Sequence, residues 1–109
     1  MENSVLFVLS LVAPPTKRKE VVHAIRPLLD PTRVLSGCLR INFYQSVENP
    51  NLLTLVQEWQ SQADLDYHLC SYEFKTLLAV AEVSSKRPEI KFLTIKRTEG
   101  LEVVQNAWA

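Results

Sequence analysis

The residue types best suited to chemistry lie in the middle of the chain, where Glu58 and Trp59 are followed by His68 nine residues beyond the tryptophan. An imidazole titrates at about pH 6.5 when unperturbed, so His68 can act as a general base or as a partner for a substrate oxyanion. Glu58 can hold or deprotonate a substrate hydroxyl if burial raises its pKa. Trp59 offers a flat surface to an aromatic ligand. These residue types can supply a base, a hydrogen-bonding carboxylate and an aromatic surface for a ligand.

Each of these residues also has a purely structural interpretation. His68 could be a helix-face histidine bonded to backbone or water, and Glu58 could pair with a cation such as Arg40. Trp59 could belong to the core or to an interface, as a tryptophan at a strand end often does. The sequence leaves both interpretations open.

Four further side chains are candidates for lining the same site. Tyr44 and Asn42 share a strand parity with Glu58 and can complete a polar lining, although ordinary cross-strand pairing would also explain them. Tyr72 and Phe74 fall on a predicted helix where they can roof a pocket, and Phe74 also suits the core.

Composition limits the function classes. The 109 residues suffice for one domain, and 47% hydrophobic against 22% charged residues indicates a folded chain. Twelve basic and twelve acidic residues cancel, which argues against a nucleic-acid binder that neutralises phosphates. The cluster Lys17-Arg18-Lys19 fits the solvated first turn of a helix. The only two glycines cannot build a phosphate loop, and there is no GxSxG elbow of a serine hydrolase.

Two cysteines, Cys38 and Cys70, are far apart and lack zinc-site spacing, so we expect free thiols in a reducing, cytoplasmic compartment rather than a disulfide. The apolar run Val5–Val12 is too short to span a membrane and lacks the positive region of a signal peptide. We interpret it as a β-strand, with no membrane association.

The hydrophobic pattern predicts alternating elements. A helix opens at Pro14-Pro15-Thr16 with one apolar stripe, is kinked or ended near Pro27, and closes at Asp30-Pro31. Ser61 and Ser71 are the N-caps of two further helices. The expected extended segments are residues 5–12, 38–46, 52–60, 90–98 and 101–104.

The order strand, helix, strand, strand, helix, strand is the split βαβ arrangement of an α+β, ferredoxin-like fold, with a four-stranded antiparallel sheet and both helices on one face. A turn near Asn49-Pro50 predicts that Tyr44 lies opposite Val56, Asn42 opposite Glu58, and Ile41 opposite Trp59. A slip of one residue would reverse the faces.

The strands are apolar at both parities, which indicates that the second face of the sheet is also covered. We expect a homodimer in which two sheets form a barrel-like core. The whole chain, 1–109, is one domain with a core at about residues 4–98, and the extension 99–109 is expected to contact the partner subunit.

This arrangement resembles the antibiotic biosynthesis monooxygenase (ABM) family over about residues 4–98. The most specific part runs from the sequence SGC through NPNLLTLVQEWQSQADLDYHLCSYEF, and the features that carry the resemblance are Gly37-Cys38-Leu39-Arg40, Tyr44, Asn49-Pro50-Asn51, Glu58-Trp59, Leu65, His68, Ser71 and Phe74.

The resemblance implies a dimeric barrel with one pocket per subunit between sheet and helices. It also implies oxidation of a quinol or phenolic aromatic ligand by molecular oxygen, with no metal or flavin cofactor. A deprotonated phenol can donate an electron to oxygen, so the protein need only bind it, deprotonate it and exclude water. His68 is the expected base or orienting partner, with Glu58 as a second catalytic group and Trp59, Tyr44, Asn42, Tyr72 and Phe74 around the substrate.

Two alternatives stay open. The haem-degrading branch of the superfamily uses an asparagine in the first strand and a histidine on the long second helix. This chain has the strand sequence Leu6-Phe7-Val8-Leu9-Ser10 and Leu78 at the expected histidine position, which disfavours haem. The other alternative is a non-catalytic ligand-binding protein, or an isomerase, of the same fold.

Overall fold

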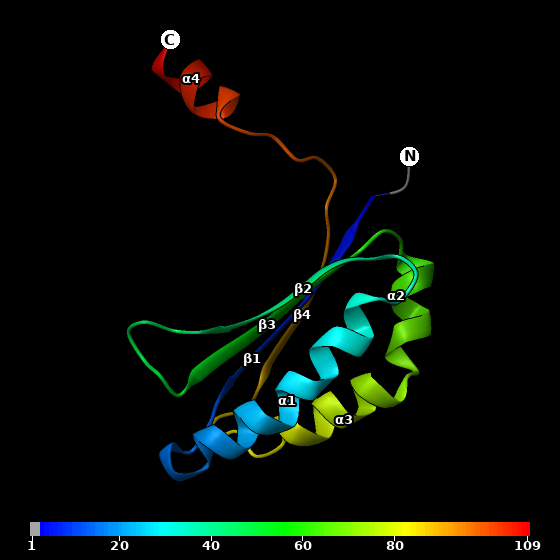
Figure 1. Cartoon of the computed structure of the whole chain (residues 1–109). Coiled ribbons are helices and arrows are strands. Elements are labelled where there is room, and N and C mark those ends of the chain that lie inside the picture. The colour runs from blue at the N-terminus through cyan, green and yellow to red at the C-terminus, as the bar shows by residue number, and fades with distance from the viewer. Residues whose placement is uncertain (1–2) are drawn as a thin grey trace.

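A computed structural model describes residues 3–109 and shows one four-stranded antiparallel sheet in the order β2-β3-β1-β4 (Figure 1). The strands are β1 Val5–Val12, β2 Cys38–Gln45, β3 Leu52–Trp59 and β4 Glu89–Thr94. The helices are α1 Arg18–Arg33, α2 Gln62–Leu69, α3 Tyr72–Ala81 and α4 Glu102–Trp108, with a 3-10 turn η1 at Pro15–Lys17. This is the ferredoxin-like α+β fold expected from the sequence.

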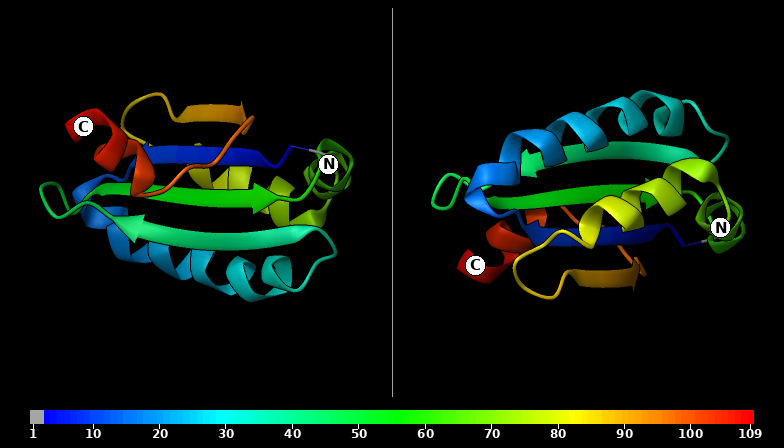
Figure 2. Two further views of the ribbon diagram at one scale, coloured as in Figure 1. Left: turned by 90° about the horizontal axis from the view of Figure 1, so that it is seen from above. Right: turned by 90° about the horizontal axis from the view of Figure 1, so that it is seen from below.

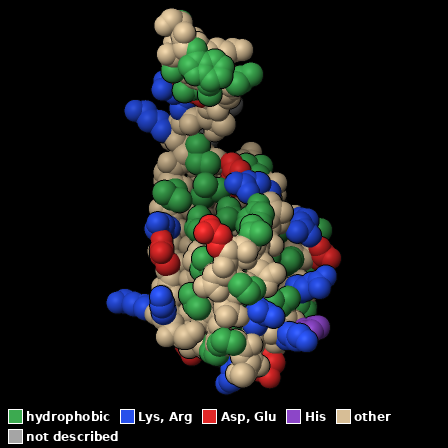
Figure 3. Space-filling model, turned by 90° about the vertical axis from the view of Figure 1, so that its left-hand side faces the viewer, with side chains coloured by type: hydrophobic (Ala, Val, Ile, Leu, Met, Phe, Trp, Pro, Cys, Tyr) green, Lys and Arg blue, Asp and Glu red, His purple; other side chains and the backbone are tan. Residues whose placement is uncertain are grey.

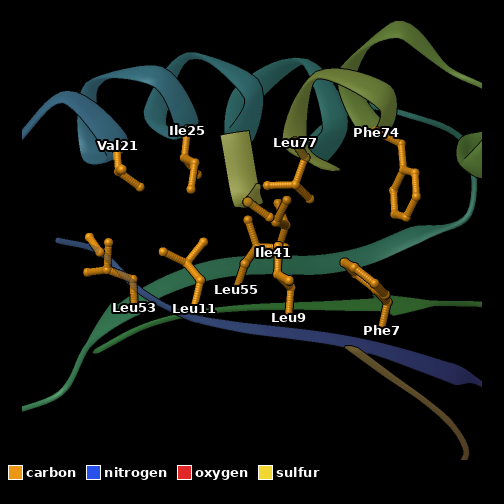
Figure 4. Close-up of a cluster of buried hydrophobic side chains, with 12 residues drawn as sticks. Phe7, Leu9, Leu11, Val21, Ile25, Ile41, Leu53, Leu55, Phe74 and Leu77 are labelled. Atoms are coloured by element: carbon orange, nitrogen blue, oxygen red, sulfur yellow. The ribbon is translucent and has the colours of Figure 1, made fainter. Parts of the chain in front are cut away.

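Helices α1 and α3 cover one face of the sheet, and among the described residues only the C-terminal segment passes over the other face (Figure 2). Buried and half-buried residues alternate strictly along β1 and β3, because successive side chains of a strand point to opposite faces. The buried residues of both strands meet apolar residues of the helices in the main core (Figure 4). This core includes Phe7, Leu9, Leu11, Val21, Ile25, Ile41, Leu53, Leu55, Phe74 and Leu77.

Helix α1 runs beyond both expected breakpoints. It contains Pro27 and Pro31 and ends at Arg33, so the prediction that it closes at Asp30-Pro31 is wrong. Leu28 and Leu29 continue its apolar stripe against the core, and the Arg33 guanidinium donates to the Ile41 carbonyl of β2 at 3.0 Å. These tertiary contacts outweigh the local cost of two prolines.

The β2–β3 register differs from the prediction by two residues. Tyr44 lies opposite Thr54 and Asn42 opposite Val56, while Glu58 faces Arg40. Ile41 pairs with Gln57, not Trp59. The turn begins earlier than expected, because the Ser46 hydroxyl accepts the backbone N–H groups of Glu48 and Asn49 at the tip of the hairpin. A shift of two residues preserves the faces, so the predicted parity of both strands is correct.

The C-terminal segment also departs from the prediction. Strand β4 ends at Thr94 instead of continuing to residue 98, and the expected extended segment 101–104 lies mostly in helix α4. The carboxylate of Glu102, the first residue of that helix, accepts the Gly100 N–H at 2.8 Å just before the helix begins. Helix α4 stands apart from the body (Figures 1 and 3), and Leu101 and Trp108 are 65% and 80% exposed.

The sheet face opposite the main helices, called the open face below, combines apolar and polar side chains. Val8 and Val56 are half-buried neighbours in the β1–β3 register, and the Ser10 and Thr54 hydroxyls share a 2.9 Å hydrogen bond beside them.

Within residues 3–109, no helix is long and apolar enough to cross a membrane. Cys38 and Cys70 are both free thiols.

Candidate ligand cavity beside helix α2

His68 is a buried polar side chain that packs against two aromatic rings. It lies in the last turn of α2 and is only 1% exposed. Its ring stacks on Trp59, with ring centroids 4.7 Å apart and an interplanar angle of 27°. Phe74 of α3 meets the same imidazole edge-on at 5.6 Å. Three of the predicted site residues, His68, Trp59 and Phe74, therefore form one aromatic cluster.

The local sequence explains why α2 points its histidine inward. Ser61 caps the helix by accepting the Asp64 N–H at 3.2 Å, which fixes where the helix begins. Leu65 is fully buried, and His68 follows it by three residues, so both side chains lie on the face that the helix turns toward the sheet.

The two ring nitrogens of His68 have different surroundings. Nδ1 lies 3.3 Å from the Ser71 hydroxyl, whereas Nε2 is buried with no hydrogen-bond partner among the described residues. Burial lowers the pKa of the imidazole below its ordinary value, and the Glu73 carboxylate offsets this only in part. The ring is therefore neutral at neutral pH. Since buried polar atoms are nearly always paired, the free Nε2 marks a position for a ligand or water.

A cavity of about 210 Å³ adjoins this imidazole. Its volume exceeds the roughly 150 Å³ of an engineered cavity that holds benzene, and is below the roughly 300–1,000 Å³ of drug-sized pockets. We call it the His68 cavity. Its walls come from α2, the end of β3 and the segment before β2, through Leu35, Ser36, Trp59, Asp64, Tyr67 and His68.

Asp64 supplies a carboxylate to the His68 cavity. The Ser61 hydroxyl donates to its Oδ2 at 2.9 Å. Gly37, in the left-handed conformation with φ +85°, lies so close that a Cβ there would come within 3.0 Å of the Asp64 side chain. The absence of a side chain at Gly37 therefore makes room for this carboxylate.

The remaining predicted site residues lie elsewhere. Glu58, Asn42 and Tyr44 are on the open face, so the sheet separates them from the His68 cavity of the same subunit. Glu58 accepts from Arg40 at 3.1 Å and from the Ser4 hydroxyl at 3.0 Å, which fits the structural interpretation of this carboxylate.

Tyr72, in the first turn of α3, is 75% exposed and is not among the residues that line the His68 cavity. Within residues 3–109, no three His, Cys, Asp or Glu side chains gather where they could share a metal ion.

Sequence reasoning missed four of the six residues that line the His68 cavity: Leu35, Ser36, Asp64 and Tyr67. A signal for Asp64 was present, because it precedes His68 by four residues and such pairs lie on one side of a helix. Gln57 was also missed. It is buried, and its side-chain oxygen accepts the Trp59 indole N–H at 2.9 Å, which fixes the ring that forms a cavity wall.

The fold and the cavity together define a ferredoxin-like α+β domain with a ligand-sized site beside a buried histidine and tryptophan. Residues 5–80 match the family described as antibiotic biosynthesis monooxygenase, and the chain belongs to that family.

Solved structures of similar proteins support the fold assignment. A conserved protein from Methanosarcina mazei Go1 is 29% identical, with a TM-score of 0.79 over 87% of this chain and 95% of that one. Rv0793 from Mycobacterium tuberculosis is 21% identical, with a TM-score of 0.80 over 89% and 99% of the two chains. An uncharacterized protein of Synechocystis, sll1783, is 27% identical over 88 residues, which are 80% of this chain and 60% of that protein. The chain thus spans less than two thirds of that relative.

Proposed function

We propose that the protein is a monooxygenase that oxidises a quinol or related phenol with molecular oxygen in the His68 cavity, without a metal or flavin. The observation that carries this proposal is the buried, neutral His68, whose Nε2 has no partner among the described residues and whose side chain lines a cavity together with Trp59. An apolar wall with one or two polar groups is the usual form of a site for an aromatic ligand.

The proposed reaction needs no electron source other than the substrate. A phenolate transfers an electron to oxygen, and the ring then forms a carbon–oxygen bond to give a hydroperoxide. Loss of water breaks the oxygen–oxygen bond and leaves a ring carbonyl. One oxygen atom enters the product and the other leaves as water, while the substrate supplies all four electrons. His68 and Trp59 are almost fully buried in the cavity wall, and exclusion of water from the reacting ring beside them would protect the intermediates.

We also propose that a second copy of the chain covers the open face. Members of the family are generally dimeric and bind small ligands. Val8, Val56 and Leu52 are only partly covered by their own subunit, so a second sheet would remove further apolar area from water. Such a dimer would also cover the Arg40–Glu58 pair.

The free thiols of Cys38 and Cys70 support the expectation of a reducing, cytoplasmic compartment.

Oxygen uptake tests the catalytic proposal. One-, two- and three-ring hydroquinones are supplied to the wild type, to His68→Phe, which keeps a ring but has no N–H donor or base, and to the exposed-histidine control His23→Gln, with autoxidation subtracted. We expect uptake in the wild type and in the control, and a loss of at least about 100-fold in His68→Phe, the size typical of a removed acid–base group or oxyanion donor. Circular dichroism verifies that each variant is folded.

The result also decides between the two classes of function left open by the sequence. Uptake that is equal in His68→Phe and wild type contradicts a role for this histidine in turnover. Ligand binding without any uptake favours the non-catalytic or isomerase alternative, and the monooxygenase proposal would then be wrong.

A further inference from the structure

One hydroxyl joins the histidine to the start of α3. Ser71 Oγ accepts the Phe74 N–H at 3.2 Å as the N-cap of that helix, and it lies 3.3 Å from Nδ1 of His68. A hydroxyl has one hydrogen and two lone pairs, so the oxygen that accepts from Phe74 still has its hydrogen to donate. Nδ1 is within reach of that hydrogen. If it accepts, it carries no hydrogen itself, and a neutral imidazole then has its N–H at Nε2.

We propose that Ser71 is a positioning residue that holds His68 in the Nε2–H tautomer, so that His68 offers a hydrogen-bond donor to the ligand and Asp64 offers the matching acceptor. The ligand part of this inference rests on the proposed function of the His68 cavity. In this arrangement His68 stabilises a substrate oxyanion and does not act as the base.

Asp64 is suited to the second contact. It precedes His68 by one helical turn, which places their Cβ atoms about 5–6 Å apart on one side of α2. Both residues line the His68 cavity. Ser61 donates to Oδ2 of Asp64, so Oδ1 remains as an acceptor for a ligand hydroxyl.

These two contacts specify the chemistry of the ligand. The oxygen at His68 must accept a hydrogen bond, and the oxygen at Asp64 must donate one. The singly ionised form of a diphenol has one oxygen of each kind. The donor at Nε2 stabilises the ionised oxygen and therefore lowers the pKa of the bound phenol. A cavity of about 210 Å³ fits one ring better than a polycyclic system. The ligand class is therefore a single-ring diphenol.

Nitrogen-15 NMR measures the tautomer without any ligand. The chain has two histidines, and the exposed His23 is assigned with His23→Gln. At about pH 8.5, two units above the ordinary histidine pKa, the His68 ring is neutral, since burial lowers its pKa further. We expect the wild-type His68 signals to show the hydrogen on Nε2.

Ser71→Asp separates capping from tautomer selection. Aspartate caps helices as well as serine does, but its carboxylate can only accept hydrogen bonds. We expect the His68 hydrogen to move to Nδ1 in this variant and to stay on Nε2 in Ser71→Thr, which keeps the hydroxyl. A wild-type hydrogen on Nδ1, or an unchanged tautomer in Ser71→Asp, would overturn the assignment.

Anaerobic binding tests the ligand class independently of turnover. In a Trp108→Phe background, Trp59 is the only tryptophan and its fluorescence reports binding of hydroquinone, with a three-ring dihydroxyanthrone as the large probe. We expect hydroquinone to bind and the large probe not to. Asp64→Ala should weaken hydroquinone binding at least about tenfold, as expected when a hydrogen bond to a charged group is lost. Asp66→Ala, an exposed aspartate on the same helix, should leave it unchanged.

The outcomes separate the two proposals. Hydroquinone binding without oxygen uptake refutes the monooxygenase and leaves the tautomer and the ligand class standing. Oxygen uptake together with equal effects of Asp64→Ala and Asp66→Ala, or with tight binding of the large probe, refutes the ligand class and leaves the monooxygenase standing.

Discussion

Replacing Gly37 by alanine tests the packing that makes room for the cavity carboxylate. Gly37 has φ +85°, a left-handed conformation that residues with a Cβ adopt at a cost of about 1–2 kcal/mol. The added methyl would also come within 3.0 Å of Cβ, Cγ and Oδ2 of Asp64. Asp64 must therefore move, and the bond that Ser61 donates to it is lost.

The expected loss of stability follows from these contributions. Loss of the Ser61–Asp64 side-chain hydrogen bond adds about 1 kcal/mol to the backbone strain. The reduced freedom of the unfolded chain offsets about 0.4–1 kcal/mol. The free energy of unfolding of Gly37→Ala should therefore fall by about 2 kcal/mol.

Urea unfolding at one fixed protein concentration, followed by tryptophan fluorescence, measures this loss. Gly100→Ala is the matched control, because the nearest atom to its added Cβ is Oε2 of the flexible Glu102 side chain at 3.1 Å. The control should change stability by less than about 0.5 kcal/mol. Equal unfolding midpoints for the two variants would refute the packing argument.

Four further predictions concern the sheet faces and the aromatic cluster. Phe74→Ala should lower the free energy of unfolding by about 3–5 kcal/mol in urea melts, because this ring packs in the core and against His68. The lowered His68 pKa means that the unfolded chain binds more protons below about pH 6.5, so stability should fall as the pH drops from there, by up to about 1.4 kcal/mol per pH unit. Urea melts between pH 5 and 7 should show that the stability of His68→Gln depends less on pH than that of the wild type. The nearby Glu73 carboxylate offsets the lowered His68 pKa only in part, so the difference should be measurable. Glu58→Gln should leave oxygen uptake within about twofold, because the sheet separates this carboxylate from the His68 cavity of the same subunit, and a larger loss would return Glu58 to the catalytic residues. If the proposed dimer forms, Val56→Lys should convert it to a monomer in light scattering, because the substitution places a charge on the open face within the proposed interface.

The sequence predicted the architecture well because its signals are local. The run Val5–Val12 and the caps at Ser61 and Ser71 lie where the structure has them, since apolar patterning and capping depend on a few neighbouring residues. The end of α1 was mispredicted because the prolines are a local signal, while the contacts of Arg33 and the core that hold the last turn come from distant parts of the chain.

The candidate site was predicted only in part for the same reason. Trp59 and Glu58 are adjacent in the sequence, and that adjacency places them on opposite faces of the sheet. The candidate site lies at His68 and not on the open face because α2 turns this side chain inward together with the buried Leu65. The contribution of Asp64 depends on Gly37, which is distant in sequence and becomes its neighbour only in the folded chain.

The two serine caps each touch a polar group of the cavity, Ser61 at Asp64 and Ser71 at His68. Each serine oxygen therefore accepts a backbone N–H, that of Asp64 or Phe74, and also contacts a polar side chain of the cavity. Amide hydrogen exchange in the first turns of α2 and α3 should slow when the cavity is filled. The exchange rates of these two amides thus report whether the cavity is occupied. A substitution that breaks either serine contact should also increase fraying of the first turn of α2 or α3.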